Sequence, residues 1–324
     1  MNRHHYTYDH PRARRGKIRD AELRKDYIQD KYVIIAPRRG NRPHELERVV
    51  RARSAVRKTC AFCPGLVEQQ RQIMTVEAKR GWMIKVITNK FPAVTLDNPR
   101  AYGMQEVVVE TPDHRPELEE LPTDHIATLF AVYAERTKQI SENPRIEYII
   151  IFKNQGGTAG ASILHAHSQI FATDFLPPHL LDKSQVVQAY KLKTGRCVYC
   201  DVIRRERKSP RMVYDDGIAV AFTPYASLYN YELWVMPARH IDNITQMNAE
   251  ERRSFAHVFK RALRKITQLG LPYNYYFHQV VHDEDQHLYF KITPRGSVWA
   301  GVEIGSGVII NPVPPEEAAA YYRK

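Results

Sequence analysis

The chain of 324 residues carries a formal charge of +12, from 48 Lys and Arg against 36 Asp and Glu. This length is enough for two domains of ordinary size, each able to bury a core unaided. No apolar run approaches the ~20 residues of a membrane-spanning helix, and residues 1–6 lack the apolar core of a signal peptide. We therefore expect a cytoplasmic protein with no membrane partner.

The positive charge is compatible with polyanionic partners and also with a solvated basic surface. A nucleic-acid-binding protein usually concentrates such charge on one stripe with interleaved aromatic residues. Here most arginines are scattered along the chain. We therefore expect a phosphorylated small molecule as the partner and not a nucleic acid.

A strand is predicted over residues 31–37, because a β-branched run there is closed by proline. A basic turn follows, which contains Arg38, Arg39 and Arg42. Three arginines on a rigid turn can form a forked clamp for a phosphate or a ribose. A solvated surface turn would show the same pattern.

Two further strands are predicted over residues 82–88 and 105–110, from runs of β-branched and apolar residues. A helix follows and runs to about Ser141, because apolar residues recur there at helical spacing. Thr123 or Asp124 is the predicted N-cap of this helix.

A glycine-rich loop joins two more predicted strands, over residues 146–153 and 165–171. Its glycines are Gly156, Gly157 and Gly160. Because glycine has no side chain, such a loop can bring backbone N–H groups close to a phosphate.

Three polar side chains are predicted to share one face of the second of these strands, because residues two apart point the same way. They are His165, His167 and Gln169. A neutral imidazole attacks phosphorus well, and an amide can hold a phosphate oxygen without offering a proton. This arrangement indicates nucleotidyl transfer through a covalent phosphohistidine. The His-x-His pair alone fits a structural metal clasp or a buried hydrogen-bonded pair equally well.

The domain boundary is placed in the proline-containing connector of residues 175–193. This gives domains over residues 1–180 and 181–324. The second half repeats the pattern of the first, with predicted strands over 218–224, 232–237, 273–278 and 287–294 and a helix over 248–269.

Each half contains a Cys-x-x-Cys pair followed by a lone histidine and then by a histidine on a strand. The two sets are Cys60, Cys63, His114 and His165, and Cys197, Cys200, His240 and His287. Two such coincidences indicate an internal duplication. Two thiolates with two imidazoles form a usual closed zinc site, so the ions would be structural. Free cysteines with core histidines remain an alternative, and redox chemistry is the weaker option because neither pair opens an obvious helix after a strand.

The two halves differ where chemistry is expected. Tyr289 stands at the position of the second histidine, and the acidic run 282–285 replaces the glycine loop. Acidic residues repel a phosphate. We therefore expect only the first half to be catalytic.

Together these residues resemble the galactose-1-phosphate uridylyltransferase family, the transferase branch of the histidine-triad (HIT) superfamily. The resemblance runs nearly end to end and is carried by residues 32–43, 60–65, 88–94, 111–114, 154–170 and 300–312. It implies an α+β fold of two HIT-like domains, each an antiparallel half-barrel sheet with packed helices.

The resemblance also implies roles for single residues. His167 would be the nucleophile that takes up the nucleotidyl group, and His165 would bind a structural Zn²⁺, with a second Zn²⁺ in the second half. Glu303 would reach across a homodimer to the hexose hydroxyls. Further substrate contacts would come from Arg39, Arg42, Asn89, Asn154, Gly160, Ser162 and Gln169.

The function implied is a ping-pong exchange of UMP between UDP-glucose and galactose 1-phosphate. Two departures from the family pattern are Ala166, where proline is common, and Tyr289. The second Cys-x-x-Cys pair resembles plant-type ADP-glucose phosphorylases. A nucleotide-sugar phosphorylase that uses inorganic phosphate is therefore the alternative, and a zinc-containing nucleic-acid-binding protein is a distant one. The base and the acceptor stay open.

Overall fold

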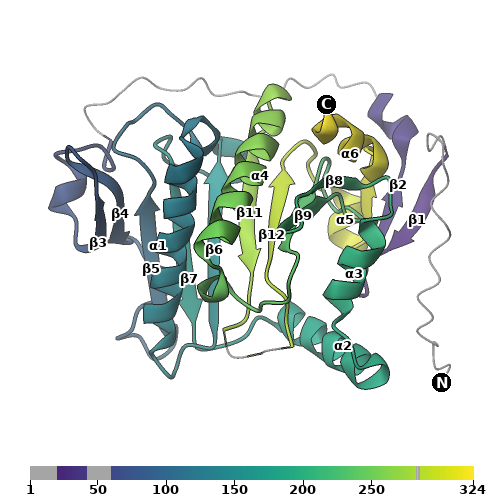
Figure 1. The fold of residues 1–324 in the computed structure, drawn as a ribbon, viewed down its shortest axis with the longest axis horizontal. Helices are drawn as coiled ribbons and strands as arrows, with labels where there is room; N and C mark the ends of the chain where they lie inside the picture. The colour runs from purple at the N-terminus through teal and green to yellow at the C-terminus, as the bar shows by residue number, and fades with distance from the viewer. Residues whose placement is uncertain (1–19, 42–59, 282, 284) are drawn as a thin grey trace.

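The computed structural model describes residues 20–41, 60–281, 283 and 285–324, and most of its strands form one antiparallel sheet (Figure 1). The strands of this sheet are β3 (Gln72–Glu77), β4 (Trp82–Thr88), β5 (Gly103–Val109), β6 (Tyr148–Gln155), β7 (His167–Thr173), β8 (Met212–Asp215), β9 (Ala219–Phe222), β10 (Leu233–Pro237), β11 (Tyr273–His278) and β12 (Tyr289–Pro294). Their spatial order is β3-β4-β5-β7-β6-β11-β12-β10-β9-β8. The predicted α+β class with antiparallel sheets is therefore confirmed.

The two halves of the sheet follow the same order outward from the central pair β6 and β11. The first half runs β6, β7, β5, β4, β3, and the second runs β11, β12, β10, β9, β8. One long helix connects equivalent strands in each half, α1 (Thr123–Ser141) before β6 and α4 (Ala249–Gln268) before β11. This repetition is compatible with the internal duplication. The domain boundary itself stays a prediction.

Helices α1 and α4 lie side by side on one face of the sheet (Figure 1). Their apolar stripes meet there, with the rings of Phe130 and Phe259 edge to face at 5.3 Å. The predicted cap of α1 is wrong, because Pro122 occupies the N-cap without a side-chain hydrogen bond. Helix α4 has a reciprocal capping box, in which Asn248 accepts from the Glu251 N–H and the Glu251 carboxylate accepts from the Asn248 N–H.

The opposite face of the second half is covered by α2 (Pro178–Thr194) and α3 (Val198–Glu206). Neither α3 nor β8 was predicted. A second sheet pairs β1 (Glu22–Lys25) with β2 (Tyr32–Ile35), and β2 with β13 (Ile309–Asn311). The remaining elements are α5 (Gly301–Ser306), α6 (Pro315–Arg323) and the 3-10 turns η1 (Pro37–Asn41), η3 (Val67–Gln69), η4 (Leu118–Glu120), η5 (Gly157–Ala159) and η6 (Ile244–Gln246). In the part of the chain that the structure describes, no helix is long and apolar enough to cross a bilayer.

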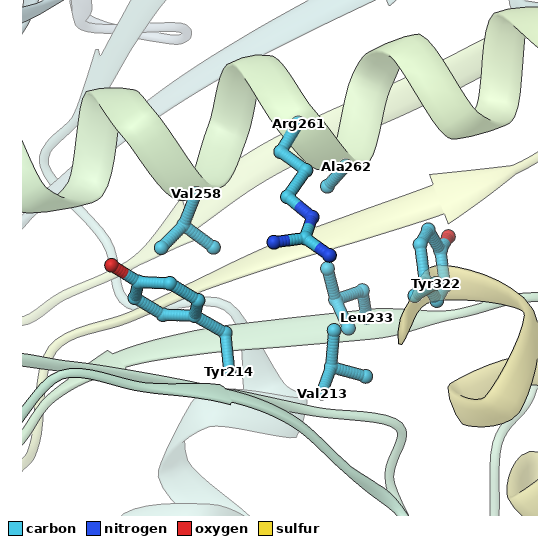
Figure 2. Close-up of a pocket in the computed structure, with 7 residues that line it drawn as sticks. All are labelled: Val213, Tyr214, Leu233, Val258, Arg261, Ala262 and Tyr322. Carbon is cyan, nitrogen blue, oxygen red and sulfur yellow. The ribbon is translucent and has the colours of Figure 1, made fainter. Parts of the chain in front are cut away.

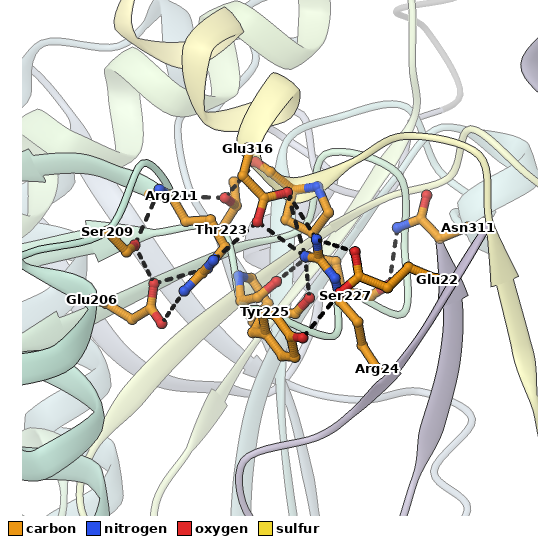
Figure 3. Close-up of polar contacts among 12 residues, drawn as sticks. Glu22, Arg24, Glu206, Ser209, Arg211, Thr223, Tyr225, Ser227, Asn311 and Glu316 are labelled. Atoms are coloured by element: carbon orange, nitrogen blue, oxygen red, sulfur yellow. Dashed lines mark hydrogen bonds and ion pairs between the residues drawn. The ribbon is translucent and has the colours of Figure 1, made fainter. Parts of the chain in front are cut away.

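An ionic network fastens both ends of the chain to the second half (Figure 3). Arg24 of β1 and Arg211 before β8 each pair with Glu316 of α6, at 3.1 and 2.9 Å. Arg211 also pairs with Glu206 of α3 at 2.7 Å. Since both arginines and Glu206 are buried, removing one member would leave a buried charge with fewer partners.

The core near this network has little spare volume. A void of about 10 Å³ lies between Val213, Tyr214, Leu233 and α4 (Figure 2). That is about the space of one water molecule, so the void is a packing defect and not a ligand site.

Candidate active site and metal centres

The first Cys/His set predicted from the sequence comes together at one point. Cys60 and Cys63 lie in the turn before η3, and His114 lies in the loop after β5. His165 lies two residues before β7, so the strand begins later than the predicted residue 165. Cys63 Sγ lies 3.4 Å from His114 Nδ1, and both sulfur atoms lie 3.6 Å from His165 Nδ1. All four candidate ligand atoms lie within 4.8 Å of one another.

These separations fit a tetrahedral metal ion. Sulfur and nitrogen ligands of a tetrahedral zinc ion, at ~2.3 and ~2.0 Å from the metal, lie about 3.6 Å apart. The other ring nitrogen of His165, Nε2, lies 2.7 Å from the carbonyl oxygen of Thr111. Donation from Nε2–H to this carbonyl leaves the Nδ1 lone pair directed at the sulfur atoms. The cluster can therefore hold a divalent ion.

The second set forms a similar but more open cluster. Cys200 Sγ lies 3.6 Å from Nδ1 of both His240 and His287. His287 Nε2 lies 3.2 Å from the Pro237 carbonyl oxygen, which parallels His165 and Thr111. Cys197 is the N-cap of α3, so this pair does open a helix that the sequence did not reveal. The pKa of the Cys197 thiol is lowered, chiefly by hydrogen bonding with Cys200.

His167 begins β7 and is oriented by its own neighbour. Its Nδ1 lies 2.8 Å from the His165 carbonyl oxygen, so Nδ1–H donates there and the lone pair is on Nε2. Burial, with the nearby Lys153 ammonium, lowers the pKa of His167 to about 4. The ring therefore stays neutral near pH 7, and Nε2 can act as a nucleophile.

Gln169 is oriented by two other amides. Its side-chain oxygen accepts from Gln105 Nε2 at 2.9 Å and from Asn89 Nδ2 at 3.4 Å. The NH₂ group of Gln169 must then point away from them, and it can donate to a phosphate oxygen. The Asn89 oxygen accepts from the Phe91 N–H. Asn89 thus touches Gln169, in addition to any contact with a nucleotide.

Gln105 is a residue that the sequence analysis missed. It lies on β5, where Val107 is paired with Gln169 and Gln105 is its diagonal neighbour. Its position within a predicted strand was visible in the sequence. The pairing of that strand with residues sixty positions later was not.

A buried charged network lies behind the histidines. Lys153 of β6 pairs with Glu110 at 2.6 Å and with Glu117 at 3.4 Å, and its ammonium lies 3.3 Å from the His167 carbonyl oxygen. The hydroxyls of Tyr133 and Ser168 lie 2.6 Å apart. These contacts hold the β7 backbone from the side away from the His167 ring.

The glycine loop is braced by the second half of the chain. Gly156 and Gly160 have φ of 86° and 91°, a left-handed conformation that favours glycine. Asn274 of β11 donates to Asn154 Oδ1 and to the Ala159 carbonyl, both at 2.7 Å. Asn274 was not foreseen, because its role depends on β6 pairing with β11. Ser162 and Gly160 are exposed on this loop.

Two predicted substrate residues lie elsewhere in the chain. Arg39 is in η1 and Glu303 is in α5, toward the end of the molecule opposite β3, β4 and β5 (Figure 1). The Glu303 carboxylate accepts from the Ala300 N–H at 2.9 Å, and this bond, with a smaller effect of Arg39, lowers its pKa. Arg42 lies outside the described residues. The other predicted residues surround His167 and the glycine loop.

The family model for the N-terminal domain of galactose-1-phosphate uridyl transferase matches residues 15–177, about half of the chain. The chain belongs to the galactose-1-phosphate uridylyltransferase family. The resemblance seen in the sequence is therefore confirmed, and with it membership in a group of nucleotidyltransferases of galactose metabolism.

Relatives within the family carry two different names. An ADP-glucose phosphorylase from Arabidopsis thaliana is 31% identical over 94% of this chain and 92% of its own length. A galactose-1-phosphate uridylyltransferase from Thermotoga maritima is 29% identical over 94% of this chain and 98% of its own. A crystal structure of the Arabidopsis ADP-glucose phosphorylase with bound ADP-glucose has a TM-score of 0.83, with 29% identity over 94% of this chain and 99% of that one. A solved uridylyltransferase has a TM-score of 0.72, with 28% identity over 93% of this chain and 97% of that one.

Proposed function

We propose that this protein exchanges UMP between UDP-glucose and galactose 1-phosphate through a covalent uridylyl-His167. The observation that carries the proposal is the orientation of His167. Its Nδ1–H is engaged with the His165 carbonyl, and its Nε2 carries the lone pair, on the strand that also bears Gln169. A fixed tautomer with one free nitrogen is what attack on phosphorus requires.

The reaction proceeds in two displacements at the same phosphorus. His167 Nε2 attacks the α-phosphorus of UDP-glucose, a P–N bond forms, and the P–O bond to glucose 1-phosphate breaks. Galactose 1-phosphate then attacks through a phosphate oxygen, the P–N bond breaks, and UDP-galactose leaves. Each leaving group is a stable phosphate anion or a neutral imidazole, so no strong general acid is needed. The Gln169 NH₂ donates to a non-bridging oxygen in both steps.

Zinc is the ion proposed for both clusters, since two thiolates and two imidazoles suit it. Four protein ligands leave no open position, so a bound ion would supply structural charge and not a reactive water. Cys60, Cys63, His114 and His165 would hold it in the first half. Because the carbonyl of His165 orients His167, a rigid first cluster also fixes the nucleophile.

A second copy of the chain is proposed to complete each site. Glu303 would contact the hexose and Arg39 the nucleotide. Both residues, however, lie toward the end of the molecule opposite β4 and β5. Val302 and Ile304, beside Glu303, are 56% and 75% exposed. Apolar side chains of that exposure suit a contact with a partner copy in a homodimer.

The second candidate is a phosphorylase that uses inorganic phosphate as the acceptor of an adenylyl group. It is favoured by the 31% identity to the ADP-glucose phosphorylase and by the second Cys/His cluster. Both candidates share the first displacement at His167. They differ in what discharges the intermediate, and a carboxylate such as Glu303 binds sugar hydroxyls but repels phosphate.

The deciding experiment isolates the nucleotidyl-enzyme after reaction with UDP-glucose or with ADP-glucose. It then compares discharge by galactose 1-phosphate and by phosphate at equal concentration. We expect uridylylation and much faster discharge by the sugar phosphate, and Glu303→Gln should slow only that reaction. Glu250→Gln, an exposed carboxylate in the first turn of α4, is the matched control. Adenylylation with equal or faster discharge by phosphate would instead establish the phosphorylase.

A further inference from the structure

A cavity of about 250 Å³ lies mainly over the second half of the sheet, reaches Tyr148 and Ile150 of β6, and does not include His167 in its lining. Its floor includes Tyr276 and His278 of β11 and Tyr289 and Lys291 of β12. Its walls come from α2 and from the turn between β1 and β2. The neighbouring β11 residue Tyr275 packs against Phe259 of α4 at 5.4 Å, so Tyr276 and His278 face the side away from that helix.

This cavity occupies the place that the candidate active site has in the first half. Strand β12 corresponds to β7, and Tyr289 follows His287 by two residues as His167 follows His165. Lys291 is paired with Tyr276, as Gln169 is paired with Phe152. A lysine therefore stands where the first half has its phosphate-orienting amide.

The lining of the cavity has an excess of positive charge. Three lysines, Lys31, Lys183 and Lys291, line it together with a single carboxylate, Asp26. Lys291 is paired with Glu232, which lies behind it, at 2.7 Å. Lys31 is exposed on the turn before β2 and marks the entrance.

Lys183 of α2 is the inner of the two lining lysines that have no ion pair, since Lys31 is exposed at the entrance. Its ammonium donates to the neutral Tyr289 hydroxyl at 2.8 Å, and among the described residues no carboxylate lies within ion-pair distance of it. Burial and repulsion from Lys291 lower the pKa of Lys183 to about 7. A bound anion would restore the full charge of this ammonium and would be attracted by it.

The rest of the lining fits a sugar ring. Trp234 is stacked on Tyr289 at 4.6 Å, and Trp299 is stacked on Tyr229 at 5.2 Å, so two aromatic pairs border the cavity. Aromatic faces pack against the C–H surface of a ring. The cavity volume of about 250 Å³ is enough for one ring and a phosphate.

We propose that this cavity is a second ligand site, which binds the phosphate monoester of a single sugar through Lys183. The phosphate accepts hydrogen bonds from the Lys183 ammonium, and the ring lies between the two aromatic pairs. The site is separate from His167 and does not depend on the reaction proposed for it. Failure of the nucleotidyl transfer experiment would leave this inference untouched.

Binding can be followed by the fluorescence of the cavity's own tryptophans. Trp234 and Trp299 line the cavity, and the chain's third tryptophan, Trp82, lies in the first half. In the full chain carrying Trp82→Phe, the emission therefore reports the second half alone. Glucose 1-phosphate and inorganic phosphate are the two probes.

We expect a saturable change in emission with glucose 1-phosphate. Lys183→Met should weaken this binding at least about tenfold, because a charge-assisted hydrogen bond is lost. Lys193→Met, the same change at an exposed position of the same helix, should alter it less than about twofold. Lys31→Met at the entrance should weaken binding by a smaller factor, and it provides the test if Lys183→Met does not fold.

Three outcomes would overturn the proposal. One is the absence of a saturable change in emission. Another is equal affinity in the folded Lys183→Met and Lys31→Met variants and the parent. The third is binding of inorganic phosphate as tight as that of glucose 1-phosphate, because a site that recognises only the anion has no sugar specificity.

Discussion

The side chains of His167 and Gln169 each use one polar atom on the protein and leave the other for a ligand. For His167 the engaged atom is Nδ1, which donates to the His165 carbonyl, and the available atom is Nε2. For Gln169 the engaged atom is the oxygen, and the available group is NH₂. The direction of each available group is therefore set by residues that need not touch the substrate.

Replacing the proposed nucleophile should separate chemistry from folding. We expect His167→Ala to abolish nucleotidyl transfer, because the proposed covalent intermediate forms on the His167 ring, while metal content and thermal stability stay near those of the parent. Mass spectrometry after incubation with nucleotide sugar alone should show one acid-labile adduct on the parent and none on the variant. Substantial turnover by His167→Ala would refute the assignment.

Gln105 gives a sharper test of orientation. In Gln105→Leu the Gln169 amide loses its stronger hydrogen bond, worth about 1 kcal/mol, and can rotate. We expect kcat to fall about fivefold with little change in thermal stability. Gln268→Leu, at an exposed position at the end of α4, is the control and should leave kcat unchanged. An unchanged kcat in Gln105→Leu would mean that the Gln169 orientation does not matter.

Helices and strands bring together residues that the sequence could place only in part. His165, His167 and Gln169 were predicted to act together because they are two residues apart on one strand. The Cys/His sets were predicted because their order repeats. Gln105 and Asn274 were not, since their contacts arise from the pairing of β5 with β7 and of β6 with β11.

The elements without a strong local pattern were also missed. Helix α3 has only 9 residues, so its apolar residues repeat over little more than two turns. Its place depends on packing against Tyr27 and Trp234, which come from distant parts of the chain. Glu303 was expected from the resemblance to reach a site across a homodimer, and with its place on α5, far from β3, β4 and β5, that role stays a prediction.

The proposed metal clusters join loops to strand ends, so loss of the metal should lower the stability of the fold. We expect metal analysis of protein purified without chelator to find about two ions per chain. Cys60→Ser and Cys197→Ser should each lower the metal content by one and lower the Tm, because the binding energy of the ion is also folding energy. Two metal-free clusters in the parent protein would contradict this prediction.

Glu316 of α6 should make stability depend on pH. Burial raises its pKa, but the charges of Arg24 and Arg211 and hydrogen bonds outweigh burial and hold the pKa below the usual value. The ionised carboxylate is therefore favoured in the folded state. Its stabilisation is complete above the unfolded pKa of about 4.3 and is lost as the pH falls through the folded pKa.

We expect Glu316→Gln to lower the free energy of unfolding by about 1.5–3 kcal/mol at pH 7, since Arg24 and Arg211 each lose one of their carboxylate contacts. The difference from the parent should shrink as the pH falls toward 3, when measured by denaturant unfolding. Glu317→Gln, the exposed neighbour in α6, should show neither effect. A difference that is constant with pH would show that the carboxylate charge is not responsible.

For the whole assembly, the proposed homodimer predicts complementation between two inactive chains. Mixed dimers of His167→Ala and Glu303→Gln would contain one site with both changes and one site with neither. Unfolding and refolding an equal mixture should therefore restore about a quarter of the parental activity. The two variants kept separate provide the baseline, and no gain on mixing would place Glu303 and His167 in the same chain's site.

The pairing of β2 with β13 joins the start of the described chain to its end. The ribosome synthesises β1 and β2 long before β13 and α6. The hairpin of β1 and β2 therefore cannot form its contacts with β13 and α6 until those elements have been made. During that time Arg24 has no Glu316, and the edge of β2 that later receives β13 is open. Vectorial synthesis thus leaves β1 and β2 among the last elements to be completed, and the arrival of β13 and α6 decides when this sheet can form.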